Sequence, residues 1–208
     1  MSTVSNSTYL SVPVLDGVTG GDAPPGDSPE RRITFVTGPG PTLLDAHESV
    51  LRYRRALLVQ CFTAGEVDDL YAFVDAQRGR LLPFWLPSGD ADLTLQSPYV
   101  GGGGVQIVIE GAGYAPGLFL SGASRRHVMV RGPSGAAFYR RIVSASWGGI
   151  GGETVDLSAS ISESLPAGTR LSFLRYCRLD EDAVKIAFDG TYAEATVPVI
   201  ELPQECPA

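Results

Sequence analysis

The protein has 208 residues, a formal net charge of -7 and 44% hydrophobic residues, which fits one large globular domain or two small ones. The acidic balance disfavours nucleic acid as the main partner, because phosphate binding needs a positive field, and no stretch approaches the roughly 20 apolar residues of a membrane span. The 25 glycines and 15 prolines favour short strands joined by turns, so we expect a mainly β fold.

Residues 1–30 are polar and turn-rich, which predicts an N-terminal arm rather than part of a core. The stretch "YLSVPVL" is the part most suited to tie the arm down, and an ordered arm in an assembly is expected to lie on a neighbouring subunit. The first residues have neither a basic segment nor a continuous apolar run, so no signal peptide is expected and folding in a cytoplasm is predicted.

Two β stretches follow the arm. "RRITFVT" alternates polar and apolar residues, and residues 49–62 ("SVLRYRRALLVQCF") alternate before they become fully apolar. The second pattern predicts a long strand that passes from a half-exposed to a buried position.

A helix is predicted over about residues 64–78. Thr63 and Glu66 have the spacing of a capping box, in which the hydroxyl and the carboxylate satisfy the first free amides. Apolar residues then recur at three- and four-residue spacing, and Gly79 is expected to end the helix. The expected apolar stripe consists of Val67, Leu70, Tyr71 and Val74, with Phe73 at its edge.

The next stretch, "GRLLPFWLPSGDADL", combines an aromatic pair with two prolines and two aspartates. It could form a catalytic loop, a ligand platform or a packed corner of a β fold. No partner for catalysis stands elsewhere in the chain, so we interpret it as a structural corner. Phe84 and Trp85 are expected to face opposite sides of an edge strand, one in the core and one toward the rest of the chain or a neighbouring subunit.

Residues 98–170 alternate short β runs with glycine turns and predict a small β-barrel. Longer strands resume at 171–179, 183–188 and 193–202, and the last of these alternates cleanly. The expected architecture is a β-sandwich core of residues 31–97 and 171–203 with its one amphipathic helix, an inserted β-barrel of residues 98–170, and a C-terminal tail of residues 204–208.

Few residues point to chemistry. Neither His47 nor His127 lies near a motif serine or cysteine, and three cysteines cannot alone supply four cluster or zinc ligands. "GGGG" at 101–104 is followed by a strand and not by a helix, so it is not a phosphate cradle. We expect no catalytic, cofactor-binding or metal-binding residue, and no enzymatic activity.

Arginine pairs recur on the predicted strands. They can be solvated strand faces, or they can pair with acidic residues of another subunit, which suits bidentate guanidinium groups. The candidate interface or corner residues are therefore Phe84, Trp85, Arg52, Arg54, Arg55, Arg140 and Arg141.

The order of these segments resembles a known family. A charged strand ("LRYRRALLVQCF") leads into a helix ("GEVDDLYAFVDAQRG") and an aromatic-proline corner ("RLLPFWLP"), and after an inserted β region a closing set of strands ends in "ATVPVIEL". This resembles the distal-tail and tail-tip ring group of minor tail proteins of long-tailed (siphovirus-like) bacteriophages. The resemblance covers about half of the chain.

The resemblance implies a structural virion protein. It implies a homo-oligomer, typically a hexameric ring, that joins the tail tube to the tip or hub complex, with the tape-measure protein and transiently DNA in its lumen and tail-fibre proteins at its periphery. An acidic inner wall suits such a lumen, because it does not retain the phosphate backbone. Assembly would take place in the host bacterial cytoplasm, without a membrane.

Three other functions compete. A carbohydrate- or receptor-binding β-module of the tail tip would use exposed aromatic side chains, among which Trp147, in a glycine-rich tip, is the candidate. A hub-type minor tail protein is the second, although related hub proteins carry four cluster-binding cysteines that Cys61, Cys177 and Cys206 do not match. A hydrolase is the third, and it lacks an identifiable nucleophile, base or metal site.

Overall fold

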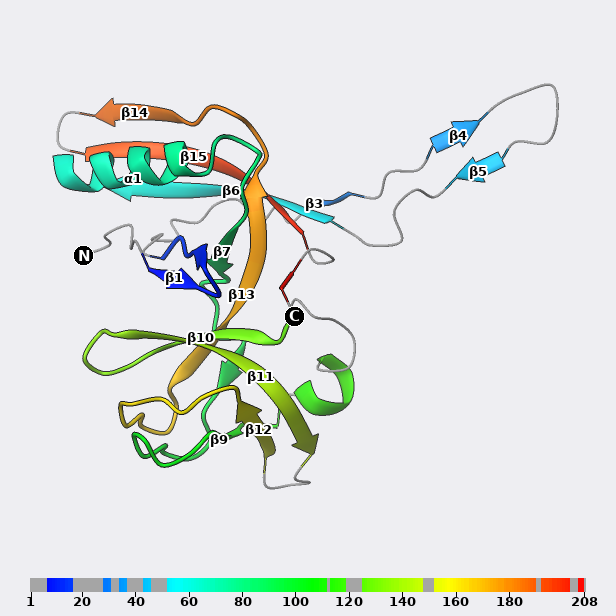
Figure 1. Ribbon diagram of the computed structural model, residues 1–208, viewed down its shortest axis with the longest axis vertical. Coiled ribbons are helices and arrows are strands. Elements are labelled where there is room, and N and C mark those ends of the chain that lie inside the picture. The colour runs from blue at the N-terminus through cyan, green and yellow to red at the C-terminus, as the bar shows by residue number, and fades with distance from the viewer. Residues whose placement is uncertain are drawn as a thin grey trace. The chain divides into compact units, whose positions relative to one another are not determined.

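The protein is mainly β. A computed structural model describes residues 7–16, 28–30, 34–36, 43–45, 52–111, 113–118, 125–147, 152–189, 192–202 and 206–207; for 28–30, 34–36, 43–45, 52–55, 117–118, 189 and 192 it describes the backbone alone. These residues contain a large antiparallel sheet and two helices, α1 (Ala64–Ala76) and the short π-helix η1 (Tyr114–Leu118) (Figure 1). None of the sheets formed by the described strands is closed, so the mainly β class is confirmed and the predicted sandwich and barrel are not.

The chain divides into two compact units, each built from separate segments. The first unit consists of Met1–Val4, Gly17–Pro83 and Cys177–Glu205, and the second of Ser5–Asp16, Phe84–Tyr176 and Cys206–Ala208. The division falls at Pro83 and Tyr176 instead of residues 97 and 170. The aromatic corner and most of one long strand therefore belong to the second unit.

The first unit is organised around two long paired strands. Its strands are β3 (Ser28–Glu30), β6 (Arg52–Cys61), β14 (Lys185–Asp189), β15 (Tyr192–Glu201) and the last residues of β13 (Arg170–Leu179). β15 pairs antiparallel with β6 over eight positions, and on its other side it pairs with β14 and then with β13. The predicted alternation is confirmed up to Val199, because Ala193, Ala195, Val197 and Val199 are buried. It ends at Ile200, which was expected on the opposite face and is buried as well. β4 (Thr34–Val36) and β5 (Leu43–Asp45) form a separate two-stranded sheet.

Helix α1 begins as the capping box predicts. The Thr63 hydroxyl accepts from the Glu66 amide, and the Glu66 carboxylate accepts from the Phe62 and Thr63 amides. The buried stripe differs from the predicted one in three residues, since Val74 is only partly buried. Phe73 is buried whereas Tyr71 is about half exposed, because the helix buries positions spaced by three residues, Val67, Leu70 and Phe73.

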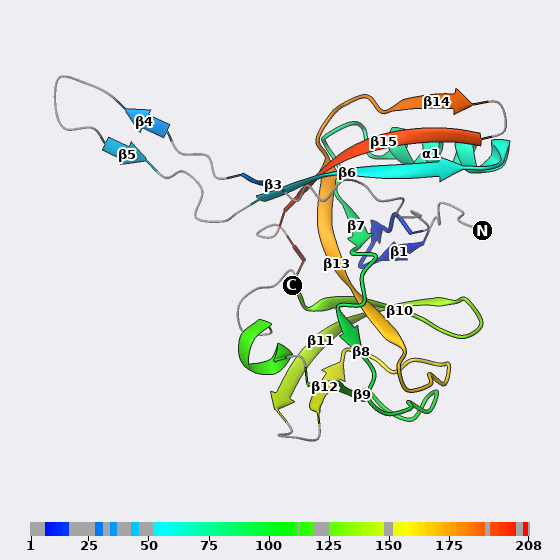
Figure 2. The same ribbon diagram turned by 180° about the vertical axis from the view of Figure 1, so that it is seen from behind.

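The second unit holds most of the other strands (Figure 2). They are β1 (Thr8–Tyr9), β2 (Val12–Pro13), β7 (Phe84–Pro87), β8 (Leu93–Thr94), β9 (Gln106–Ile109), β10 (His127–Arg131), β11 (Ala137–Trp147) and β12 (Glu153–Leu157). The pairing order is β13-β10-β11-β12-β9, and β7 and β8 also pair with β13. β1 and β2 form a small hairpin of their own.

The core of the second unit comes from alternate residues of these strands. Ile107 and Ile109 of β9, and Val128 and Val130 of β10, are buried in one hydrophobic cluster. The same cluster takes residues from β8, β11, β12 and β13, as period-two burial on one face of a sheet requires. Backbone bonds outside the named strands join residues 94–96 to β9: the Gln96 amide donates to the Val108 carbonyl and the Glu110 amide to the Thr94 carbonyl, both at 2.9 Å.

The exit of α1 depends on a close approach that only glycine permits. Gly79 has φ +65°, and a Cβ atom there would lie 2.6 Å from Oδ1 of Asp182, an oxygen that also accepts from the Arg80 amide. Gly79→Ala is therefore expected to lower the free energy of unfolding by about 2 kcal/mol or more, because left-handed backbone strain adds to the steric clash. Denaturant unfolding measures this.

Two further variants separate the two causes. Gly89 has a similar φ of +78° with no atom within 4 Å of an added Cβ, so Gly89→Ala should show the backbone strain alone. In an Asp182→Ala background, Gly79→Ala should cost about as little as Gly89→Ala. An unchanged cost in that background would contradict the clash with Asp182.

Candidate functional site

The aromatic corner forms the centre of a buried cluster in the second unit. Phe84 and Trp85 are both 0% exposed. A contact with a neighbouring subunit would require one of them to face solvent, and neither does. The Trp85 ring lies 4.7 Å from the His127 ring, 5.0 Å from that of Tyr176 and 5.4 Å from that of Tyr9, measured between centroids. These residues come from four distant parts of the sequence, so the cluster is a tertiary feature.

Residues 7–16, hereafter the N-terminal strap, cover Trp85. The Trp85 indole donates to the carbonyl oxygen of Tyr9 at 3.1 Å, and the Leu15 amide donates to the Trp85 carbonyl at 2.9 Å. Val14 forms a parallel bridge with Trp85, and both Val14 and Leu15 are fully buried. The sequence predicted that "YLSVPVL" ties the arm down, but on a neighbouring subunit; here it lies on the second unit of its own chain.

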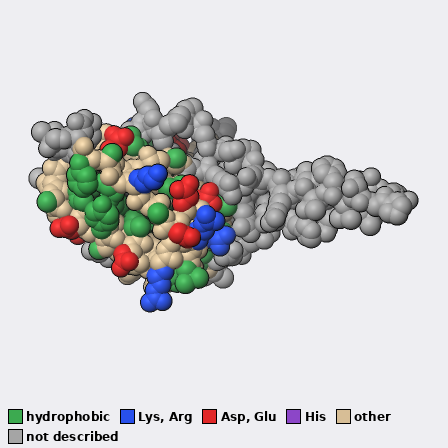
Figure 3. All heavy atoms as spheres, turned by 90° about the horizontal axis from the view of Figure 1, so that it is seen from above, with side chains coloured by type: hydrophobic (Ala, Val, Ile, Leu, Met, Phe, Trp, Pro, Cys, Tyr) green, Lys and Arg blue, Asp and Glu red, His purple; other side chains and the backbone are tan. Residues whose placement is uncertain are grey.

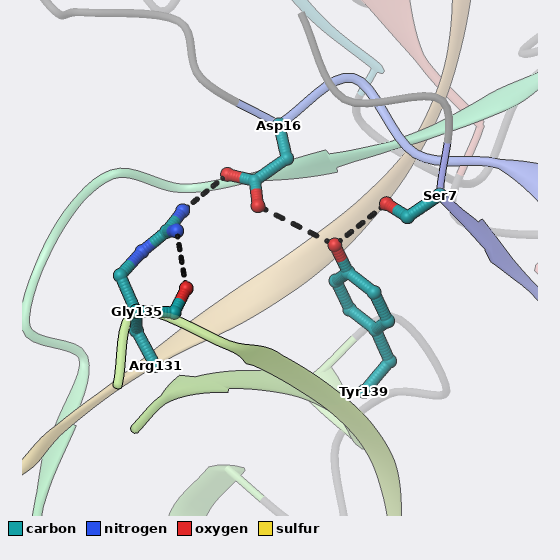
Figure 4. Close-up of polar contacts among 5 residues, drawn as sticks. All are labelled: Ser7, Asp16, Arg131, Gly135 and Tyr139. Atoms are coloured by element: carbon teal, nitrogen blue, oxygen red, sulfur yellow. Dashed lines mark hydrogen bonds and ion pairs between the residues drawn. The ribbon is translucent and has the colours of Figure 1, made fainter. Parts of the chain in front are cut away.

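Polar contacts hold the end of the strap (Figure 4). Nη2 of Arg131 lies 2.7 Å from Oδ1 of Asp16, and Nη1 donates to the Gly135 carbonyl at 3.3 Å. The Tyr139 hydroxyl donates its one proton to Oδ2 of Asp16 at 3.4 Å. It therefore accepts from the Ser7 hydroxyl, which lies 2.8 Å away. Asp16 is almost fully buried, and a buried carboxylate requires a charged partner, which here is Arg131.

His127 connects the strap to the C-terminal residues. Its ring is 1% exposed, with Nδ1 3.0 Å from the Tyr9 hydroxyl and Nε2 3.2 Å from the Pro207 carbonyl. A carbonyl only accepts, so Nε2 carries the proton and Nδ1 accepts from Tyr9. The pKa of His127 is lowered to about 4, mainly by burial and with a smaller contribution from Arg141 and Arg126, whereas the bond to Pro207 acts in the opposite direction. Burial also raises the pKa of Tyr9 to about 12.

Two other carboxylates of this unit, those of Asp92 and Glu153, have structural partners. Oδ2 of Asp92 accepts from the Ser88 hydroxyl and, at 2.8 Å, from the Phe173 amide, so the "PSGDAD" turn is fastened to β13. Glu153 is fully buried, and its two oxygens accept from the amides of Tyr114 and Ala115 at the start of η1. These groups are satisfied by hydrogen bonds and act as supports for the backbone.

The remaining predicted residues are dispersed. Arg140 donates to the carbonyl oxygens of Ala159 and Ser160, which makes it an internal brace. Arg141 lies on β11 opposite His127, and its Nε is buried without a hydrogen-bond partner. Trp147 is 56% exposed at the end of β11. Strand β6 carries Arg52, Arg54 and Arg55, but the structure does not describe their side chains. His47 lies outside the described residues.

The described residues contain no group of three or more metal-ligating side chains. In the same part of the chain, no helix has the length and apolar character needed to cross a membrane. No protein-family model and no curated protein matches the sequence. We call five residues of the second unit the strap site: Trp85, His127, Arg131 and Tyr139, which the strap contacts, and Tyr176, which contacts Trp85.

Sequence reasoning identified Trp85 but missed most of this site. Tyr9, Asp16 and His127 were not proposed as partners, because each stands far from the corner in the chain. The one available signal was the apolar character of "YLSVPVL" inside a polar arm, followed at once by Asp16. It indicated that the segment is buried somewhere, but not against which residues.

The protonation of His127 makes the stability of the second unit depend on pH. The folded-state pKa of about 4 lies below the unfolded value of 6.5, so the unfolded chain binds the proton first as pH falls. Stability should be complete above pH 6.5 and decrease between pH 6.5 and 4, by up to about 3 kcal/mol. Denaturant unfolding across this range measures the slope.

His127→Gln is the matched control, since an amide can accept from Tyr9 and donate to Pro207 without titrating. Its stability should change less over the same pH interval than that of the unsubstituted protein. Equal slopes for the two proteins would contradict a buried neutral histidine.

Proposed function

We propose that this protein is a structural, non-enzymatic virion protein of a bacteriophage tail tip, similar to the distal tail proteins. In this proposal it forms a homo-oligomeric ring, typically a hexamer, between the tail tube and the tip or hub complex. The ring takes part in tail assembly, contacts the tape-measure and tail-fibre proteins, and lets DNA pass. The observation that carries the proposal is the succession of elements in the first unit.

That succession follows the order on which the resemblance rests. β6 ends at Cys61, the Thr63 capping box starts α1 at once, and Gly79 closes the helix exit against Asp182. After the second unit the chain returns through β13 and β14 to β15, which pairs along β6. The first unit is thus formed by the chain segments that flank the insertion, and it has one helix and two long central strands. This arrangement supports the proposal that it is the ring-forming core.

The surface of the first unit supports oligomerisation. Figure 3 shows hydrophobic side chains gathered on the part of the surface formed by this unit. Its exposed large hydrophobic residues are Phe62, Tyr71, Leu81, Leu82 and Phe188, the last 69% exposed. Phe188 lies on β14, which among the described strands pairs only with β15, so it presents an open edge. Exposed apolar residues near an open strand edge favour contact with another protein.

We further propose that the second unit is a small closed β-barrel inserted into this core. The supporting observation is the pair of backbone bonds that joins residues 94–96 to β9, since the adjacent β8 pairs with β13 at the other end of the strand order. The hydrophobic cluster then corresponds to a barrel interior filled by alternate side chains. Such a module would project from the ring and present its loops to fibres or to the cell surface.

Ring formation is tested by mass photometry and negative-stain imaging of the purified protein. A ring of defined stoichiometry is expected. Phe188→Glu should decrease the ring population about tenfold or more at a fixed concentration, because a carboxylate would be buried in the contact. The thermal unfolding of the monomer should not change, since the side chain is exposed.

Val143→Glu on the second unit, also an exposed position, is the control and should leave the ring intact. A protein that stays monomeric at all concentrations and does not enter tails would overturn the proposal.

A second function, carbohydrate or receptor binding by the second unit, is favoured by one observation. Trp147 is exposed at the end of β11, and its ring lies 3.8 Å from where a Cβ atom on Gly111 would stand, so an open glycine surface adjoins it. Glycans stack on such exposed indole faces. On a glycan array, binding that Trp147→Ala abolishes without a change in unfolding temperature would support this function. An array without any signal would reject it.

A further inference from the structure

We propose that the N-terminal strap is exchanged between subunits, so that in the assembled ring the strap of one copy fills the strap site of a second copy. The proposal rests on the ring proposed above and names the segment that links its subunits. In the single chain the strap lies on its own second unit, and exchange would make the same contacts between two chains.

The first observation is the isolation of the strap in the chain. Residues Ser5–Asp16 belong to the second unit, whereas Met1–Val4 before them and Gly17–Pro83 after them belong to the first. The strap is thus an isolated segment of the second unit, and the body of that unit starts only at Phe84. The contacts described for the strap are with residues of the second unit, and the same residues are present in every copy of the chain.

The second observation is that the site must stay occupied. The Trp85 indole donates to Tyr9, and the Trp85 backbone accepts from Leu15. Without a strap the indole surface would be exposed and its donor would lose this acceptor. A strap of a second copy satisfies the same groups, so exchange leaves no site empty, whereas simple release would.

The third observation is specific recognition. Asp16 is paired with Arg131 and Tyr139, while Tyr9 reaches Nδ1 of His127. One charged pair, one phenol–imidazole bond and the buried Val14 and Leu15 side chains distinguish this segment from an arbitrary peptide. The segment that fits the site is therefore this strap, which a second copy carries as well.

Isotope-mixed cross-linking tests the exchange. A photo-reactive residue replaces Leu10, which is 48% exposed in the strap, and the full-length chain is assembled from equal amounts of ¹⁴N- and ¹⁵N-labelled protein mixed before assembly. If straps are exchanged, about half of the cross-linked peptides should combine the two isotopes, because partners are drawn at random. Products from one isotope alone would overturn the exchange.

The same sample separates this proposal from the ring. Rings that contain only same-isotope cross-links would leave the proposed function in place and reject the exchange. A monomer with same-isotope cross-links would reject both.

A charge reversal gives an independent test. Asp16→Arg and Arg131→Asp each place like charges in contact within a chain, whereas a strap of either variant matches the site of the other. Mixing the two variants should therefore restore the protection of residues 9–16 from hydrogen exchange, which each variant alone should lose. The double variant, Asp16→Arg with Arg131→Asp, controls for folding and should be protected by itself. No recovery on mixing, with a protected double variant, would show that the strap stays on its own chain.

Discussion

The burial of the Trp85 indole is the constraint on which the second unit depends. A tryptophan in the centre of a unit contributes a large apolar surface, but its N–H group must find an acceptor, since an unpaired buried donor costs about 1–3 kcal/mol. Here the acceptor is the carbonyl oxygen of Tyr9. The strap is thereby an integral part of the unit, although it belongs to a distant part of the sequence.

The same requirement determines the state of the groups around the indole. His127 is surrounded by rings, and burial keeps its pKa low, so the ring stays neutral while its two nitrogens bond Tyr9 and Pro207. Asp16 is paired with Arg131 at the rim of the site. Histidine, aspartate and tyrosine close together resemble a catalytic group, but each polar atom already has a structural partner. The cluster therefore acts as a fastening between chain segments.

The two units differ in what they offer to partners. The second unit directs its largest side chains inward, and its exposed aromatic group is Trp147 at one end of β11. The first unit exposes several apolar side chains, among them Phe188 on β14, which pairs with β15 alone among the described strands. In the proposed ring, this asymmetry would give the contacts between subunits to the first unit and a peripheral function to the second. The proposed exchange of the strap would add a further link between neighbours.

Local features of the protein were determined by the sequence itself. The start of α1 at the Thr63–Glu66 capping box, the long strand β6 before this helix and the alternation of β15 follow from spacing within a few residues. The end of α1 was predicted too late: the helix ends at Ala76, and Arg78 already has a φ of +51°. Hydrogen bonds and side-chain periodicity in these elements are local, so a short window contains the required information.

The tertiary structure alone decided the rest. It decided that the chain divides at Pro83 and not near residue 97, because the pairing of β7 and β8 with β13 places the corner in the second unit. It also decided that Trp85 meets Tyr9 and His127, and that Asp92 accepts from the Phe173 amide of β13. These outcomes depend on contacts between residues far apart in the chain, and no local pattern specifies which buried surface meets which.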